Sequence, residues 1–255
     1  MNPLNWKNPT AHFPGRLLAL DTSTSAMSIA ILEQGRLLKE AHIHADRTHS
    51  IHLMPMIKEL MQGSGMKFSD LSAIAVGVGP GSYTGVRIGV TAAKTLAWTL
   101  KLPILGVSSL EAMAFGAAIS GRNEQIVESV NNQPQWIVPM MDARRAQAYT
   151  GLYCLQGSEW QCLVNDGIRL VDRWLEQLAK LSEEELLRPR ILFIGEMTPT
   201  HSIHAQIKEA EVAAMHIGLL GSLRLAAGAR ANVHQLIPNY TQLTEAENNL
   251  LAKSH

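Results

Sequence analysis

A glycine-rich turn is the most distinctive chemical feature of this 255-residue sequence. It follows an apolar stretch, precedes a run of small residues, and carries four glycines: Gly77, Gly79, Gly81 and Gly85. Backbone amides in a turn that leads into a helix can hold an anion such as a phosphate. However, a Walker A loop needs Lys where Val86 stands, and a dinucleotide-binding fingerprint needs glycine at Ser82. A tight turn that packs the helix closely on the strand explains the spacing equally well.

Histidine and serine offer two further candidates for chemistry. Histidines gather at four positions in one region of the sequence: His42, His44, His49 and His52. His49 and His52 would share a helix face, but the next acidic residue is Glu59, which is poorly spaced to complete a metal site. Ser82 lacks the Gly-x-Ser-x-Gly elbow of hydrolase nucleophiles, because Thr84 is the second residue after it. We therefore expect no metal and no serine nucleophile, and the Ser82 hydroxyl is expected to cap the loop.

Composition limits the partners of the chain. Its 22 basic residues balance 22 acidic ones, so the whole protein does not attract a nucleic-acid backbone, and any contact with one must be local or shared. We expect Cys154 and Cys162 to be reduced core thiols, with a cross-strand disulfide as the alternative. No apolar run of about 18 residues and no signal-like segment occurs, which favours a cytoplasmic protein.

A regular order of strands and helices must position these residues. In the first half, apolar patterns predict three strands, a helix that Pro55 would kink, a strand before the glycine-rich turn, a helix, a strand and another helix. The expected strands are 16–21, 26–32, 36–41, 71–78 and 103–107. The expected helices are 48–62, a helix from the glycine-rich turn to about residue 100, and a helix from about residue 109. In the second half, strands are expected at 136–142, 147–155, 160–164 and 191–196, with a helix at 171–181.

The second half repeats the first. Asp142 follows Asp21, and Gly195 follows Gly77, at nearly the same offset, which indicates a duplicated unit of three strands, a helix and a strand. Two such α/β lobes, each a mixed sheet flanked by helices, resemble the actin-like (ASKHA, ribonuclease H-like) architecture. We expect a flexible N-terminal extension (1–15), a first lobe (16–107), a second lobe (108–237) and a C-terminal tail (238–255).

A nucleotide site of the actin-like kind would lie between these lobes. Its candidate ligand loop consists of Asp21, Thr22, Ser23, Gly79, Gly81, Ser82, Thr84 and Gly85. Ser23 stands where that architecture has glycine, and Arg144 and Arg145 crowd the matching turn of the second half. Glu196 would also repel a phosphate. An active small-molecule kinase or ATPase is therefore the alternative that the sequence disfavours.

Several motifs together resemble the TsaB (YeaZ) family. They lie at residues 17–23, 49–55, 77–89, 103–108 and 142–145, with Pro238, Asn239, Tyr240, Ala246 and Glu247 near the C-terminus. The Gly-Pro-Gly-Ser-Tyr-Thr-Gly-Val-Arg block is the most specific of them. The resemblance covers about residues 16–247 and leaves out the first 15 residues. Thr241 and Gln242 also depart from it, because the family often has Leu-Arg there.

The resemblance implies a function in tRNA modification. The related catalytic protein, TsaD, carries metal-binding histidines in a His-x-x-x-His stretch, where this chain has Ser109 and Met113. The chain therefore resembles the non-catalytic partner, and neither a metallopeptidase nor a cofactor is implied. By resemblance, it would pair with TsaD, recruit the ATPase TsaE, and support threonylcarbamoyladenosine formation next to the anticodon of ANN-decoding tRNAs. It would contact tRNA indirectly, form a homodimer when alone, and have no membrane association.

Two helices could supply the partner surface. Apolar residues cover more than half the circumference of the helix expected at 48–62, and small residues line one side of the helix after the glycine-rich turn. The expected interface residues are Met54, Met56, Ile57, Met61, Gly89, Ala92, Ala93 and Ala97. A tightly packed internal neighbour would explain the small residues as well, so that alternative stays open.

Overall fold

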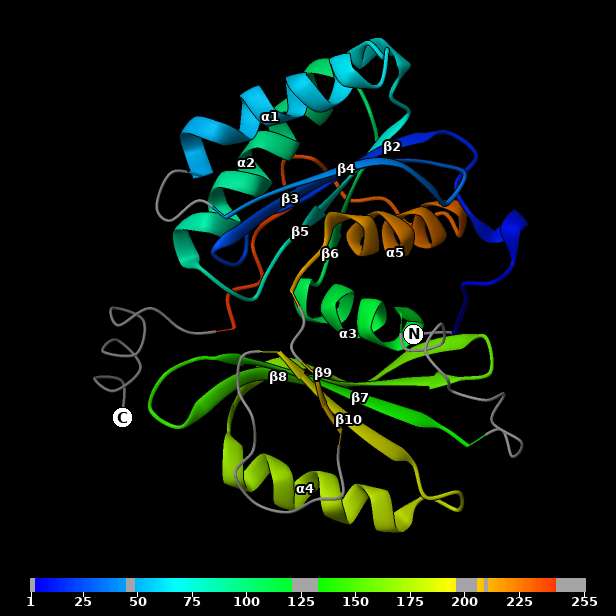
Figure 1. Ribbon diagram of the computed structural model, residues 1–255, viewed down its shortest axis with the longest axis vertical. Helices are drawn as coiled ribbons and strands as arrows, with labels where there is room; N and C mark the ends of the chain where they lie inside the picture. Colours follow the sequence, from blue (N-terminus) through cyan, green and yellow to red (C-terminus); the bar gives the residue numbers. More distant parts are fainter. Residues whose placement is uncertain (1–2, 45–48, 121–132, 196–205, 209–210, 242–255) are drawn as a thin grey trace.

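The computed structural model of the protein describes residues 3–44, 49–120, 133–195, 206–208 and 211–241. Two β-sheets and the helices around them stack in layers (Figure 1). Helices α1 (His49–Gly63) and α2 (Tyr83–Leu100) cover the outer face of one sheet, and α4 (Val171–Glu184) covers the outer face of the other. Helices α3 (Ser109–Ser120) and α5 (Ala214–Ala226) lie between the two sheets.

The first sheet has the strand order β4-β3-β2-β5-β6. Its strands are β2 (Arg16–Asp21), β3 (Ala26–Glu33), β4 (Arg36–His44), β5 (Ala73–Gly77) and β6 (Ile104–Val107). The first three form an antiparallel meander, and β5 pairs parallel to β2, with β6 parallel to β5. Strand β2 is buried on both faces, because Leu18 and Leu20 pack toward α1 and α2 while Leu17 and Ala19 pack toward α5.

The second sheet has the order β1-β9-β8-β7-β10-β11. Its strands are β1 (Leu4–Asn5), β7 (Gln135–Asp142), β8 (Gln147–Gln156), β9 (Glu159–Leu170), β10 (Arg190–Gly195) and β11 (Gln206–Lys208). Strands β7, β8 and β9 are antiparallel neighbours, and β10 pairs parallel to β7. The order of three antiparallel strands, a helix and a parallel strand therefore occurs twice, which confirms the predicted duplicated α/β fold.

Four features differ from the sequence-based expectations or go beyond them. The segment expected to be a flexible extension contributes β1 and a short 3-10 helix, η1 (Pro9–Ala11). A second 3-10 helix, η2 (Phe68–Asp70), precedes β5. Helix α5 belongs to the range expected for the second lobe, yet it packs on β2, β3 and β5 of the first sheet. The structure also gives α5, which was not predicted from the sequence, and a β9 that extends beyond the predicted strand at 160–164.

The two cysteines face opposite sides of the second sheet. In the register of β8 and β9, Cys154 lies opposite Gln161, while Cys162 lies opposite Tyr153. Because neighbouring residues in a strand alternate between faces, the two thiols cannot form the cross-strand disulfide that was the alternative. Both are free, and Cys162 is only partly buried. None of the helices in the described part of the chain has the length and apolar character needed to cross a bilayer.

Candidate functional site

Asp21, at the end of β2, is a fully buried carboxylate that the protein itself satisfies. Its Oδ2 accepts a 2.6 Å hydrogen bond from the Ser109 hydroxyl at the start of α3. Its Oδ1 accepts bonds from the amide and the hydroxyl of Ser23, at 2.8 and 2.7 Å. Burial raises the pKa of Asp21, and the bonds from Ser109 and Ser23 oppose that shift. A Cβ atom on Gly77 would lie 1.7 Å from Oδ2, so glycine is needed there to admit the carboxylate.

The glycine-rich turn closes against the loop that follows Asp21. A Cβ atom on Gly81 would lie 2.2 Å from the carbonyl oxygen of Ser23, and one on Gly85 would lie 2.1 Å from that of Thr22. The Ser82 amide donates to the Ser23 carbonyl oxygen at 2.7 Å, and the Thr22 hydroxyl donates to the Gly85 carbonyl oxygen at 2.7 Å. The glycines therefore serve close packing between two loops of the first lobe.

Backbone amides of the turn are also engaged within the protein. The Gly79 amide donates to the Ser109 hydroxyl at 3.1 Å, and the Gly85 amide donates to the Ser82 hydroxyl at 3.2 Å. Ser82 is thus the N-cap of α2, as expected. Amides that would meet a phosphate in an anion-binding loop are used here to hold the loop together.

The predicted ligand loop borders a polar cleft of about 570 Å³ between the lobes. Ser23, Gly81 and Ser82 line it from the first lobe, and Arg144 and Arg145 line it from the turn between β7 and β8. Asp21 lies beneath the loop instead, with 1% of its surface exposed. The arginine turn is conformationally unusual, since residues 144–146 have consecutive positive φ angles of 66°, 52° and 56°. Glu196, the predicted repelling carboxylate, lies outside the described residues.

Ser109 and Met113, at the two positions where the resemblance would place metal-binding histidines, are buried in the protein core. Ser109 has 0% of its surface exposed and bonds Asp21, as described above. Met113 lies one helical turn later on α3, has 2% of its surface exposed, and belongs to the core between the sheets. Both side chains therefore serve packing and internal hydrogen bonding.

A second concave surface lies between α1 and α2, on the outer face of the first lobe. This α1–α2 groove has a volume of about 440 Å³ and is lined by Ser50, Leu53, Met54, Tyr83, Thr84, Arg87, Ile88, Thr91 and Ala92. Ile51, Met54 and Tyr83 have 67%, 44% and 52% of their surfaces exposed. The Arg87 guanidinium carbon lies 4.6 Å from the centre of the Tyr83 ring, and the centres of the Tyr83 and Tyr240 rings are 5.8 Å apart. The groove is thus an exposed, mainly apolar surface with aromatic residues at one end.

The structure divides the expected interface residues into two groups. Met54 and Ala92 line the groove. The other six are buried within the first lobe: Met56, Ile57, Met61, Gly89, Ala93 and Ala97. A Cβ atom on Gly89 would lie 2.3 Å from the Thr22 hydroxyl, so an internal neighbour explains this small residue. A charge at Met56 or Ala93 would disrupt the core, so neither can test the surface alone.

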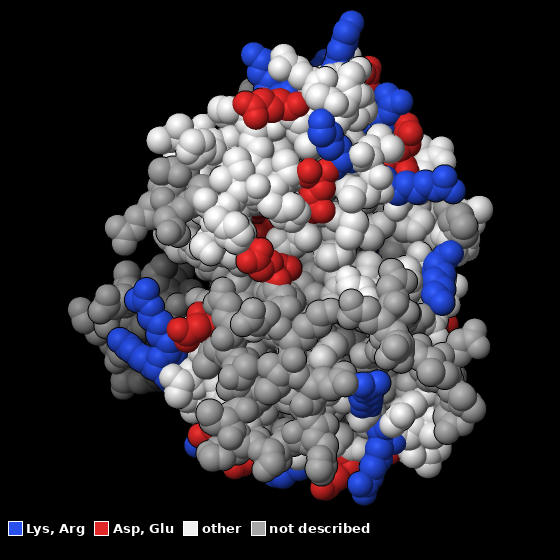
Figure 2. Space-filling view, viewed as in Figure 1, with Lys and Arg blue, Asp and Glu red and all other residues white. Residues whose placement is uncertain are grey.

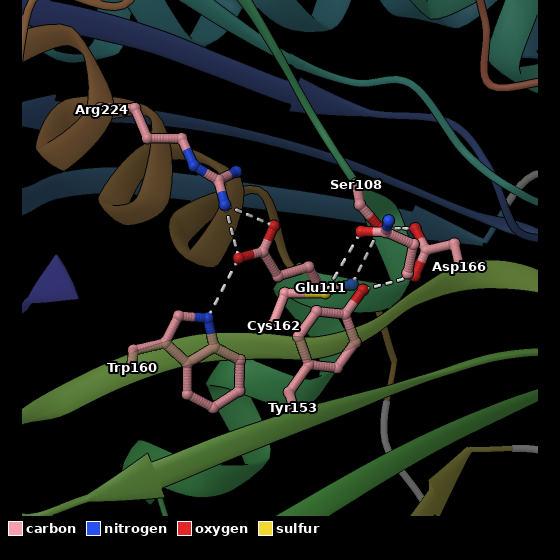
Figure 3. Close-up of polar contacts among 8 residues, drawn as sticks. Ser108, Glu111, Tyr153, Trp160, Cys162, Asp166 and Arg224 are labelled. Atoms are coloured by element: carbon pink, nitrogen blue, oxygen red, sulfur yellow. Dashed lines mark hydrogen bonds and ion pairs between the residues drawn. The ribbon is translucent and has the colours of Figure 1, made fainter. Parts of the chain in front are cut away.

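A buried polar network between the lobes was not anticipated from the sequence (Figure 3). Glu111 on α3 accepts two hydrogen bonds from the Arg224 guanidinium on α5, at 2.6 and 2.7 Å, and a third from the Trp160 indole at 3.1 Å. Asp166 on β9 accepts bonds from the hydroxyls of Ser108 and Tyr153. Burial raises the pKa of Asp166, and these two bonds oppose the shift. The Glu and Arg of this network are far apart in sequence, so no local pattern could reveal it.

Comparisons with known proteins give one consistent result. A family model for TsaD, tRNA N6-adenosine threonylcarbamoyltransferase, matches residues 42–249. The tRNA threonylcarbamoyladenosine biosynthesis protein TsaB of Bacillus subtilis is 39% identical over 245 residues, which cover 91% of this chain and 96% of that protein. The TsaB protein of Escherichia coli is 44% identical over 103 residues, or 40% of this chain and 44% of that protein.

Solved structures agree with the sequence comparison. YeaZ from Pseudomonas aeruginosa has a TM-score of 0.68 and 27% sequence identity, with 89% of this chain and 99% of that chain covered. A second structure from the same organism, described as similar to peptidase YeaZ, has a TM-score of 0.70 and 28% identity, with 89% and 100% covered.

Proposed function

The chain belongs to the TsaB (YeaZ) family of tRNA threonylcarbamoyladenosine biosynthesis proteins, and we propose that it acts there as the non-catalytic scaffold that pairs with TsaD. The observation that carries the proposal is the closed contact between the Asp21 loop and the glycine-rich turn. Ser109 and Ser23 donate hydrogen bonds to both oxygens of the Asp21 carboxylate, and the amides of Gly79 and Gly85 donate to serine hydroxyls. No space for a side chain remains at Gly81 and Gly85. A catalytic actin-like site instead needs this carboxylate and these amides free for metal and phosphate.

The α1–α2 groove is the proposed surface for TsaD. The TsaD family model matches residues 42–249 of this chain, a range that includes both helices. A TsaD subunit should therefore have a similar pair of helices, and two such pairs can pack around a pseudo-twofold axis. The exposed Ile51, Met54 and Tyr83 side chains supply the apolar contacts. When TsaD is absent, a second copy of this chain would use the same surface, which gives the proposed homodimer.

The remaining partners follow from the same proposal. TsaE would join the assembled pair, and tRNA would be bound mainly by the other subunits, in the cytoplasm. On the face shown in Figure 2, basic and acidic side chains of the described residues are interspersed. The balanced charge of the chain and the mixed charges on this face support indirect tRNA contact, because strong binding to a phosphate backbone needs a concentrated basic surface.

A reconstitution tests the scaffold function. Unmodified tRNA and threonylcarbamoyl adenylate are incubated with this chain alone, with TsaD alone, or with both proteins and TsaE, and modified adenosine is measured by mass spectrometry. We expect no product from this chain alone and efficient formation only when TsaD is also present. Product formed by this chain without TsaD would refute the non-catalytic proposal.

A further inference from the structure

The N-terminal segment reaches from the first lobe to the far edge of the second sheet. We call residues 3–15 the strap; it continues directly into β2 of the first lobe. In β1, Leu4 pairs with Trp160 and Asn5 pairs with Glu159 of β9, so the strap forms an additional edge strand of the second sheet. In Figure 1 this dark-blue segment runs along one side of the molecule, from the upper layer to the lower. One short segment therefore contacts both lobes.

The end of the strap nearer β2 is fixed to the first lobe by contacts other than the chain connection. The Phe13 amide donates to the hydroxyl and the carbonyl oxygen of Ser222 on α5, at 2.9 and 3.2 Å. The His12 ring packs on Gly35 in the turn between β3 and β4, where an added Cβ atom would lie 2.4 Å from the ring. Because these contacts involve backbone atoms and a glycine, the position of the strap is narrowly defined.

The other end is fixed by an aromatic cluster that spans the lobes. The Trp6 ring meets Phe115 of α3 edge-on at 6.0 Å, and Phe115 meets Trp160 of β9 at 5.2 Å. Tyr153 of β8 stacks on Trp160 at 5.6 Å, with 6° between the ring planes. Trp160 also donates to Glu111, which holds Arg224 of α5 (Figure 3). The N-terminal end of the strap therefore packs on Phe115 of α3, next to Trp160 of the second sheet. Through Glu111, the same helix also binds Arg224 of α5, which packs on the first sheet.

We propose that the strap is a conformational lock that holds the two lobes of this chain at a fixed angle. Without it, the lobes meet mainly through α3 and α5, and packed helices of this kind allow shear motions between domains. The strap crosses that contact and is anchored on both sides of it. The lock would keep the polar cleft and the α1–α2 groove in one relative orientation. The strap precedes the residues that the TsaD family model matches, 42–249, and the proposed lock does not depend on the proposed tRNA function.

Distance measurements by electron spin resonance test the lock. One spin label is placed on each lobe, at Lys58→Cys on α1 and Glu176→Cys on α4, where both side chains are exposed. The background carries Cys154→Ala and Cys162→Ser. The labelled protein is diluted in unlabelled protein, so that distances between two copies of the proposed homodimer do not contribute. We then expect a single narrow distance distribution for the full chain. Deleting residues 1–14 should at least double its width, or move it to a second distance.

Point variants keep the test independent of the deletion. Trp6→Ala combined with His12→Ala removes a ring contact at each end of the strap and should also broaden the distribution. Thr10→Ala, in the exposed middle of the strap, should leave the distribution narrow, because among the described residues its hydroxyl bonds only the nearby Asn8. Circular dichroism establishes that each variant is folded. An equally narrow distribution in the double variant, or a broad one in the full chain, would overturn the proposal.

Discussion

Asp21 is an acidic residue whose carboxylate accepts hydrogen bonds from the protein itself, although its position in the sequence is typical of a ligand site. A carboxylate at the end of the first strand of a two-lobed fold is well placed for a metal or a phosphate, and the sequence predicted it as part of a ligand loop. In the structure, Ser109 from α3 and Ser23 supply its hydrogen bonds. Ser109 therefore has a structural role, because its hydroxyl donates to one oxygen of the buried carboxylate and accepts from the Gly79 amide.

The Ser109 hydroxyl should contribute measurably to stability. Ser109→Ala removes a bond to the buried Asp21 carboxylate and leaves the Gly79 amide without its acceptor. We expect a loss of about 3 kcal/mol in the free energy of unfolding, measured by urea denaturation, because a buried charged group loses a donor. Ser25→Ala is the control, since Ser25 is exposed in the same loop and should change stability by less than about 0.5 kcal/mol. Equal effects of the two changes would contradict this account of Asp21.

His216 on α5 should make the fold sensitive to acid. Burial lowers its pKa to about 4, with a smaller raising effect from Glu40, and neither ring nitrogen has a hydrogen-bond partner among the described residues. The unfolded chain takes up this proton near pH 6.5, the ordinary pKa of histidine, so it binds more protons than the folded chain between pH 4 and pH 6.5. Stability should therefore fall as the pH falls through this window, by up to about 3 kcal/mol.

The variant His216→Phe isolates that contribution. A phenyl ring keeps the approximate size of the side chain and carries no titrating group. Urea denaturation at pH 7.5 and pH 5 should then show a smaller acid-induced loss of stability in the variant than in the unaltered chain. The same loss in both proteins would show that other groups cause the pH dependence.

At the scale of elements, the first turn of α2 is held in close backbone contact with the loop after β2. A Gly85→Ala change would place a methyl group 2.1 Å from the Thr22 carbonyl oxygen, which belongs to the rigid loop after β2. We expect a loss of about 2 to 3 kcal/mol in the free energy of unfolding, because the start of α2 and this loop must separate. Thermal or urea denaturation measures it.

Gly63→Ala provides the matched control for that change. Its new methyl group would meet only the flexible end of Lys39, and the residue lies at the end of α1. Alanine is also the better helix former, so the substitution should be neutral or slightly stabilising. A similar loss in both variants would mean that the Gly85 contact has no special importance.

The helices show what a sequence pattern can and cannot resolve. Both α1 and α2 lie close to their predicted ranges, because apolar residues at helical spacing identify them. Their faces were harder to assign, since Met54 and Met56 are chemically identical while one is exposed and the other is buried. Helix α5 was not predicted at all. It is buried on most of its surface, so its sequence lacks the polar face that marks an amphipathic helix.

At the scale of the whole molecule, the duplication could be predicted because equivalent strand ends recur at a nearly constant spacing. The order of elements in each lobe follows from that repeat. Contacts between the lobes could not be predicted in this way. The Glu111–Arg224 ion pair and the pairing of Leu4 with Trp160 join residues more than a hundred positions apart. Such contacts depend on the final packing of α3, α5 and the strap, and no local periodicity records them.

The central claim is that this chain is a scaffold that binds TsaD through the α1–α2 groove. Met54→Glu places a charge in the groove, while Leu186→Glu places the same charge on the other lobe, at a residue with 99% of its surface exposed. Calorimetric titration with TsaD should show at least about 100-fold weaker binding for Met54→Glu, or about 3 kcal/mol, because the interface would bury an unpaired charge. Leu186→Glu should bind like the unaltered chain. If folded Met54→Glu binds TsaD as tightly as Leu186→Glu does, the groove is not the TsaD surface and the account is contradicted.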